Sequence, residues 1–113
     1  MKQKQYNPEL TLLLTILSLA IMMIGMVFNF VAVSTNHGKM PVKEFLSYET
    51  NTHFSYQENW EVNHWYFTDI IDLKYYIVSI GDVLMVLGLS STIILLIKYV
   101  FYKTKHLNSI NTW

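Results

Sequence analysis

Two residue types are missing from this sequence, cysteine and arginine. Without cysteine there can be no disulfide, no thiolate metal ligand and no cysteine nucleophile. All eight basic residues are therefore lysine, which lacks the planar fork that makes arginine the favoured residue for bidentate phosphate and base recognition. We accordingly expect no nucleic-acid partner.

Charge is also scarce, and its distribution is uneven. Charged residues make up 14% of the chain and hydrophobic residues 52%. Residues 10–33 contain no charged side chain, and residues 76–97 contain only Asp82. At about 1.5 Å per residue, a helix through either block is long enough for a hydrocarbon core of about 30 Å. The sequence thus predicts an all-α membrane protein built as a two-span transmembrane helical hairpin.

The start of the first block is well marked. Asn7 suits an N-cap, Pro8 the first helical position, and Glu9 the positive end of the helix dipole. A cleaved signal peptide is the alternative, because Lys2 and Lys4 precede the block and small residues end it. The apolar stretch exceeds the length of a signal h-region, so we favour an uncleaved anchor.

Lysine positions predict the orientation. Lys2 and Lys4 flank the first block, and three lysines follow the second, at positions 98, 103 and 105. Residues 34–75 carry three lysines and six acidic residues, a balance of 3 − 6 = −3. Because cytoplasmic flanks are enriched in lysine, we expect a multi-pass protein of the cell membrane with both termini in the cytoplasm.

The expected organisation follows from these boundaries. It comprises a cytoplasmic N-terminus (1–9), a transmembrane helix (10–33), an extracytoplasmic loop (34–75), a second transmembrane helix (76–101) and a cytoplasmic C-terminus (102–113). The loop is expected to carry short helix or irregular structure, with Pro41 opening a helix through Leu46 or Tyr48. Aromatic residues alternate with acids over 54–67, which is typical of a segment lying on headgroups or on the rest of the loop; we favour such packing over a ligand site.

Small residues suggest how the helices meet. They recur every seven positions, as Ser18, Gly25 and Ala32 in the first block and as Gly81 and Gly88 in the second. Such residues permit close helix approach in lipid. Antiparallel pairing of Asn29 with Asp82 would put Ala32 beside Ser79 and Gly25 beside Val86. The same surface would also suit a seam between copies or with a partner.

Asp82 allows two interpretations. An ionisable residue within a span suggests ion passage, a proton relay or a partner's cation. However, Ser79-Ile80-Gly81-Asp82 has the S-x-x-D form of a helix start, so the second helix would begin near Ile80 and run to Phe101. We favour this capping role.

Other chemistry is weakly indicated. His37, His53 and His64 lie among acidic residues, but no metal-ligand spacing is present. The methionines at 22, 23 and 26 fit packing better than soft-metal transport. No nucleophile stands at motif spacing from a base. We expect no metal, no cofactor, no small-molecule substrate and no enzymatic activity.

Two motifs resemble those of an uncharacterised family of small bacterial membrane proteins. They are Asn36-His37-Gly38-Lys39-Met40-Pro41-Val42 and Ser79-Ile80-Gly81-Asp82-Val83-Leu84. In that family N-G-[KR]-M-P-V and S-I-G-D flank an extracytoplasmic segment, and His37 departs from the pattern. The resemblance implies that Lys39, Met40, Pro41 and Asp82 cluster at the outer surface, with a salt bridge between Lys39 and Asp82. Together with the residues expected at the contact between the two helices, these residues form one candidate cluster: Asn29, Lys39, Met40, Pro41, Ser79, Gly81 and Asp82.

The function expected from these features is non-enzymatic. The leading hypothesis is an accessory, regulatory or immunity-type protein that sits in the lipid bilayer and binds another membrane protein or itself. The alternative is a self-associating pore or ion pathway that uses Asp82 and Asn29. A third possibility is an extracytoplasmic sensor that uses His53 and His64.

Overall fold

The computed structural model describes residues 5–111, so Lys2 and Lys4 lie outside the described residues. The chain begins and ends with a long helix, and a segment of short elements connects the two. In chain order the elements are α1 (Pro8–Ser34), β1 (Met40–Lys43), β2 (His53–Tyr56), η1 (Asn59–Glu61), η2 (Trp65–Phe67), β3 (Ile71–Asp72), β4 (Ile77–Val78) and α2 (Ile80–Asn111).

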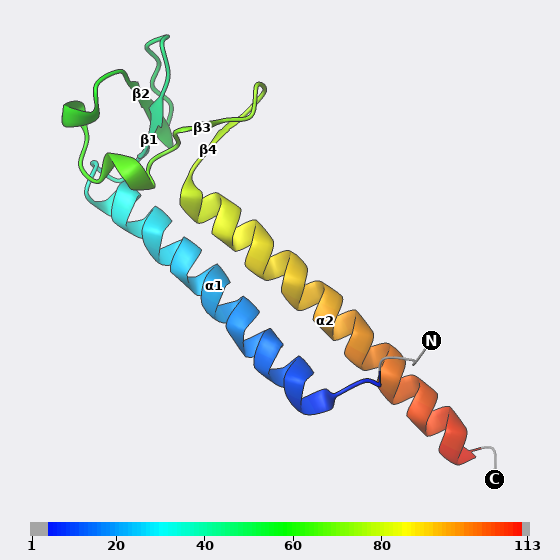
Figure 1. Ribbon diagram of the computed structural model, residues 1–113. Coiled ribbons are helices and arrows are strands. Elements are labelled where there is room, and N and C mark those ends of the chain that lie inside the picture. Colours follow the sequence, from blue (N-terminus) through cyan, green and yellow to red (C-terminus); the bar gives the residue numbers. More distant parts are fainter. Residues whose placement is uncertain (1–4, 112–113) are drawn as a thin grey trace.

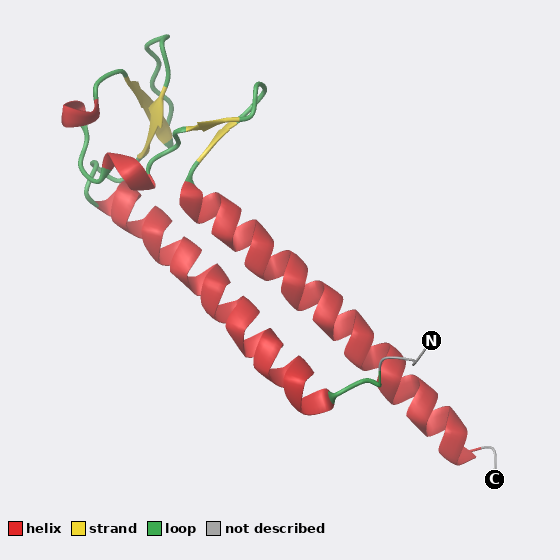
Figure 2. Ribbon diagram, in the orientation of Figure 1, coloured by secondary structure: helices red, strands yellow, loops and turns green. Residues whose placement is uncertain are grey.

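The molecule is elongated, with extents of 68 × 27 × 26 Å. Helices α1 and α2 lie side by side and run in opposite directions (Figure 1). Residues 35–79, here called the head, gather at one end of the pair, and all the strands are in it (Figure 2). Both helices therefore meet the same small folded segment.

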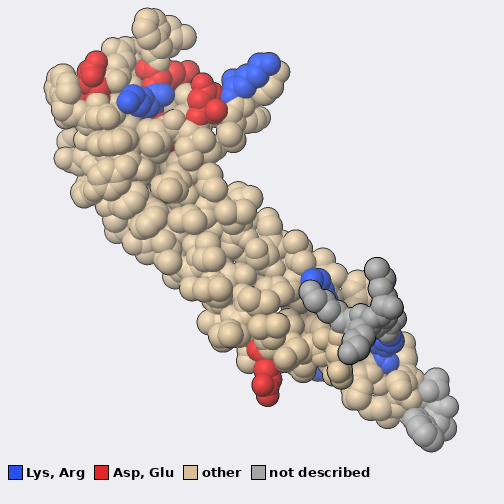
Figure 3. Space-filling view, viewed as in Figure 1, with Lys and Arg blue, Asp and Glu red and all other residues tan. Residues whose placement is uncertain are grey.

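Both helices are long and apolar enough to cross a membrane. In each, only 11% of the most apolar stretch is buried, whereas a core helix of a soluble domain buries a continuous apolar stripe. Charged side chains gather at the two ends of the visible face, leaving the middle of the helix pair without them (Figure 3). This distribution fits a lipid-facing surface.

The helix starts agree with the predicted caps. The Asn7 side chain accepts hydrogen bonds from the backbone N–H of Glu9 (3.1 Å) and Leu10 (3.2 Å). At α2, the Asp82 N–H donates to Ser79 Oγ (3.0 Å), and the Ser79 N–H donates to Asp82 Oδ2 (3.1 Å). This reciprocal capping box starts α2 at Ile80, as the S-x-x-D pattern predicts.

The bounds of the second apolar block differ from those predicted. Residues 76–79, assigned to the span by hydropathy, are not helical, because residues 77–78 pair as β4 with β3. Helix α2 continues to Asn111, beyond the expected end at Phe101. Residues 102–111 contain no proline or glycine, so no helix-breaking residue ends the helix where the apolar run ends.

Small residues line the contact between the helices. Ser18, Gly25 and Ala32 are the buried residues of α1, and Gly81 and Gly88 are buried on α2. A Cβ added to Gly25 would lie 2.5 Å from the Gly81 carbonyl oxygen. The predicted contact of Gly25 with Val86 is wrong, because Gly25 faces Gly81 and Met85 while Val86 is 63% exposed. The two glycines set a register that turns Val86 outward.

The head contains strands where a helix was expected. The predicted helix from Pro41 is wrong: Pro41 lies in β1, which pairs in parallel with β2. On the other edge of β1, the Lys43 N–H donates to the Asp69 carbonyl (2.9 Å) and the Asp69 N–H donates to the Pro41 carbonyl (3.0 Å). These pairings over long sequence distances override the local helix signal of Pro41.

The head has a small core of its own. Its buried apolar side chains are Met40, Pro41, Val42, Tyr56 and Val62. The segment 54–67 is divided among β2, η1 and η2. Phe67 of η2 stacks on Phe28 of α1 with ring centroids 4.3 Å apart. This contact fixes the head on the end of α1.

Candidate functional site

A polar cluster lies in the helix seam next to the head. The Asn29 Nδ2 donates to Asp82 Oδ1 (2.8 Å), and the Ser79 Oγ donates to Asn29 Oδ1 (2.7 Å). Gly81 lies against the Asn29 side chain. The predicted pairing of Asn29 with Asp82 is therefore present, and the capping box of α2 is joined to α1 through it.

The remaining members of the candidate cluster lie elsewhere. Met40 and Pro41 are buried in the head. Lys39 forms an ion pair with Glu49, with Nζ and Oε1 2.7 Å apart. The predicted salt bridge of Lys39 with Asp82 is wrong, because Lys39, which directly precedes β1, reaches Glu49 in the connection before β2, while Asp82 is held by Asn29 and Ser79.

The first motif forms a tight exit from α1. Asn36 is buried; its Nδ2 donates to the Ala32 carbonyl (2.7 Å) and its Oδ1 accepts from the Asn63 N–H (2.8 Å). His37 and Gly38 follow with positive φ angles of 61° and 80°. Because the left-handed region favours glycine, His37 occupies a conformation that most side chains avoid.

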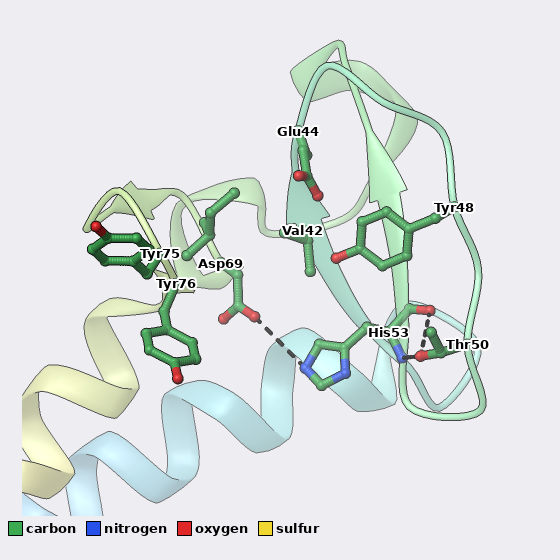
Figure 4. A pocket seen from close by; sticks show the side chains of 9 residues that line it. Val42, Glu44, Tyr48, Thr50, His53, Asp69, Tyr75 and Tyr76 are labelled. Carbon is green, nitrogen blue, oxygen red and sulfur yellow. Dashed lines mark hydrogen bonds and ion pairs between the residues drawn. The ribbon is translucent and has the colours of Figure 1, made fainter.

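A pocket of about 320 Å³ opens on the head. We call it the head pocket; it is lined by Val42, Glu44, Tyr48, Thr50, His53, Asp69, Tyr75, Tyr76 and Ile77. Figure 4 shows Asp69 between the two tyrosines of the β3–β4 turn and the side chains of Tyr48 and His53. Segments from across the head therefore converge on one carboxylate.

Asp69 is held in an unusual environment. Its backbone is fixed against β1, and the residue is only 5% exposed. His53 Nε2 lies 3.7 Å from Asp69 Oδ2, whereas Oδ1 is buried and has no hydrogen-bond partner among the described residues. Burial raises the pKa of the Asp69 carboxyl from 3.8 to about 7, and the negative charge of Asp82 contributes to this rise.

The opposite wall carries a second carboxylate and a phenol. Burial raises the pKa of the Tyr48 hydroxyl, and the negative charges of Glu44 and Asp69 add to the rise. Backbone bonds position this wall: the Ser55 N–H donates to the Tyr48 carbonyl (3.0 Å), and the His53 N–H donates to Thr50 Oγ1 (3.0 Å). Glu44 and Asp69 thus supply the negative charge beside the neutral Tyr48 hydroxyl.

The two histidines of the sensor hypothesis occupy different environments. His53 faces Asp69, whereas Nδ1 of His64 lies 3.3 Å from Thr35 Oγ1. No group of three histidine or acidic side chains within residues 5–111 is arranged to hold a metal ion. The residues needed for a joint metal site are therefore not brought together in the described part of the chain.

Sequence reasoning missed Asp69 as a site residue. It was counted only among six acidic residues, since nothing local distinguishes it from Asp72. Its burial depends on pairing with Val42 of β1, which lies 27 positions earlier in the sequence.

Comparison with curated proteins finds no match, and comparison with solved structures finds none either. A family model matches residues 10–94, a range that includes both helices' contact region, the head and the polar cluster. The chain therefore belongs to the family of unknown function DUF5317.

Proposed function

We propose that this chain is a two-span integral protein of the cell membrane that acts without catalysis, as an accessory, regulatory or immunity-type partner of another membrane protein. The observation that carries the proposal is the exposed apolar surface of the helix pair. Each helix uses a narrow row of small residues for its neighbour and leaves most of its apolar side chains uncovered. Lipid covers such a surface, and a second membrane protein can pack on it.

Charge supports a topology with both termini in the cytoplasm. Three lysines, at positions 98, 103 and 105, follow the apolar part of α2, whereas acidic residues outnumber lysines in the head. Exposed aromatic residues occur near both ends of the apolar part of α2, with Tyr75 and Tyr76 before it and Phe101 shortly after it. Such positions suit the two membrane interfaces. The motifs at 36–42 and 79–84 support placing the chain with small bacterial membrane proteins.

The seam contacts favour this function over a pore. Asn29 and Asp82 hydrogen-bond to each other, and Ser79 bonds to both. A polar route across copies would require these groups to face water in the assembly. Their mutual pairing supports a structural role, in which the polar cluster fixes the helix register.

Purification of the full chain from mild detergent after crosslinking in cells is expected to recover a second membrane protein in fixed ratio. Replacing exposed Leu89 and Ile93 of α2 with alanine tests one face of the pair; Leu12 and Ile16 of α1 provide the matched change on the other helix. Loss of the partner with one pair only would locate the docking face, because truncation there removes packing area.

A chain that stays monomeric and without a partner under every condition would contradict the proposal. A defined oligomer whose conductance changes on Asp82→Asn would instead support the pore.

A further inference from the structure

The head pocket combines negative charge with aromatic rings. Asp69 and Glu44 contribute carboxylates, and Tyr48, Tyr75 and Tyr76 contribute rings. Tyr75 and Tyr76 stand on one side of Asp69 and Tyr48 on the other (Figure 4). Carboxylates attract cations, and the faces of aromatic rings attract them as well.

No lysine of the described chain neutralises these carboxylates. Lys39 is paired with Glu49, and Lys43 donates to Asn59 Oδ1 (2.9 Å). The ammonium nitrogen of Lys74 lies 5.5 Å from the Tyr75 ring centroid, and Lys74 is not among the residues that line the pocket. An ammonium group can thus approach the Tyr75 ring.

The buried carboxylate supplies the second observation. Asp69 is more than nine-tenths buried, points into the pocket and has one oxygen without a hydrogen-bond donor among residues 5–111. A buried carboxylate oxygen without a donor is costly, so such groups in native proteins are usually explained by a ligand, an ion or a functional role.

The lining favours an organic cation over a metal ion. No metal-binding group of three acidic or histidine side chains exists within residues 5–111. Aromatic walls suit an alkylated or primary ammonium, whose charge is spread over a larger and less hydrated surface than that of a metal ion. The volume of about 320 Å³ is at the small end of the range for ligand sites.

We propose that the head pocket binds a small organic ammonium group, which Asp69 and Glu44 attract and the tyrosine rings flank. This site goes beyond the accessory function and does not depend on it. Because Tyr75, Tyr76 and Ile77 lie three to five positions before the first residue of α2, the pocket lies beside the proposed membrane surface. The ammonium group therefore belongs either to a free amine or to a lipid headgroup.

Ammonium binding should strengthen as pH rises through about 7, where Asp69 loses its proton. The titratable groups around Asp69 are Glu44, Tyr48, His53, Tyr75 and Tyr76, which line the pocket, and Asp82 at the start of α2; the charged group beside Tyr75 is Lys74.

The test uses the full chain in phosphatidylglycerol nanodiscs at pH 8, with choline as the probe and 3,3-dimethylbutanol as its uncharged isostere. Ligand-observed NMR should show saturable binding of choline and none of the isostere. Asp69→Asn is expected to weaken choline binding at least about tenfold. Tyr75→Leu should weaken it about threefold or more, and Tyr75 is 82% exposed, so this change leaves the fold intact. Glu49→Gln, which removes a head carboxylate outside the pocket, is the matched control.

Equal binding of choline and its isostere, or unchanged affinity in both Asp69→Asn and Tyr75→Leu, would overturn the proposal. Absence of saturable binding by choline and by ethylammonium would do so too. A further arm adds phosphatidylethanolamine to the nanodiscs. Competition with choline would identify a headgroup as the ligand, and unchanged choline affinity would identify a free amine.

Discussion

Gly81→Val is expected to separate the two helices at the end next to the head. A Cβ at position 81 would overlap the Asn29 side-chain amide and lie 2.6 Å from the Gly25 carbonyl oxygen. The second of these atoms belongs to a helix backbone and cannot move without shifting α1. The change also displaces Asn29 from Asp82, so the polar cluster is lost together with the close approach.

The size of this effect follows from two contributions. Overpacking costs about 1–3 kcal/mol, and each lost hydrogen bond to Asn29 adds about 1 kcal/mol. The free energy of unfolding should therefore fall by roughly 3–5 kcal/mol. SDS titration of the reconstituted protein, followed by circular dichroism and by amide hydrogen exchange in α2, measures this fall.

Ala20→Val is the matched control, because it introduces the same valine at an exposed position of α1. It should change the free energy of unfolding by less than about 0.5 kcal/mol. Equal stability of Gly81→Val and Ala20→Val would show that the glycine seam does not hold the helices together.

Asp69→Asn is expected to remove a pH dependence of stability. With the pKa of Asp69 at 3.8 in the unfolded chain and about 7 in the folded protein, the folded protein holds this proton over the intervening range. The contribution of Asp69 to the free energy of unfolding should thus fall by at most about 4 kcal/mol as pH rises from about 4 to about 7. Above pH 7 this contribution should stay constant. The asparagine variant should lack this fall.

The measurement is the difference in unfolding free energy between wild type and variant at pH 4.5 and pH 8. At pH 8 Asp69→Asn should be more stable than wild type by up to about 3 kcal/mol. The gain is reduced by the cost of burying the asparagine amide without hydrogen-bond partners. Glu58→Gln removes an exposed carboxylate of the head and serves as control. A difference that is the same at both pH values would contradict the account of Asp69.

The helices and their seam were predictable because their signals are local and periodic. The apolar runs, the Asn7 cap, the S-x-x-D start and the small residues at intervals of seven all lie within one helix. The pairing of Asn29 with Asp82 could be predicted because the two residues lie at a similar depth in the membrane when the helices are antiparallel. The register error at Val86 arose because depth alone does not fix which face of a helix turns inward.

The head was much less predictable. Strand β1 depends on partners 13 positions away in β2, by the register of Met40 with His53, and further along at Asp69. Propensity around Pro41 favours a helix start, and only tertiary pairing reverses it. The head pocket forms only after three separated segments have come together, so no short sequence motif predicts it.

Site-specific cysteine labelling tests the two-span topology most directly, since the sequence has no cysteine of its own. Ser47→Cys in the head and Thr104→Cys near the end of α2 each create a single exposed thiol. In intact cells a membrane-impermeant maleimide should label position 47 and not position 104, and both should react after permeabilisation. Labelling of position 104 in intact cells, or protection of position 47, would contradict a membrane protein with an outer head and cytoplasmic ends.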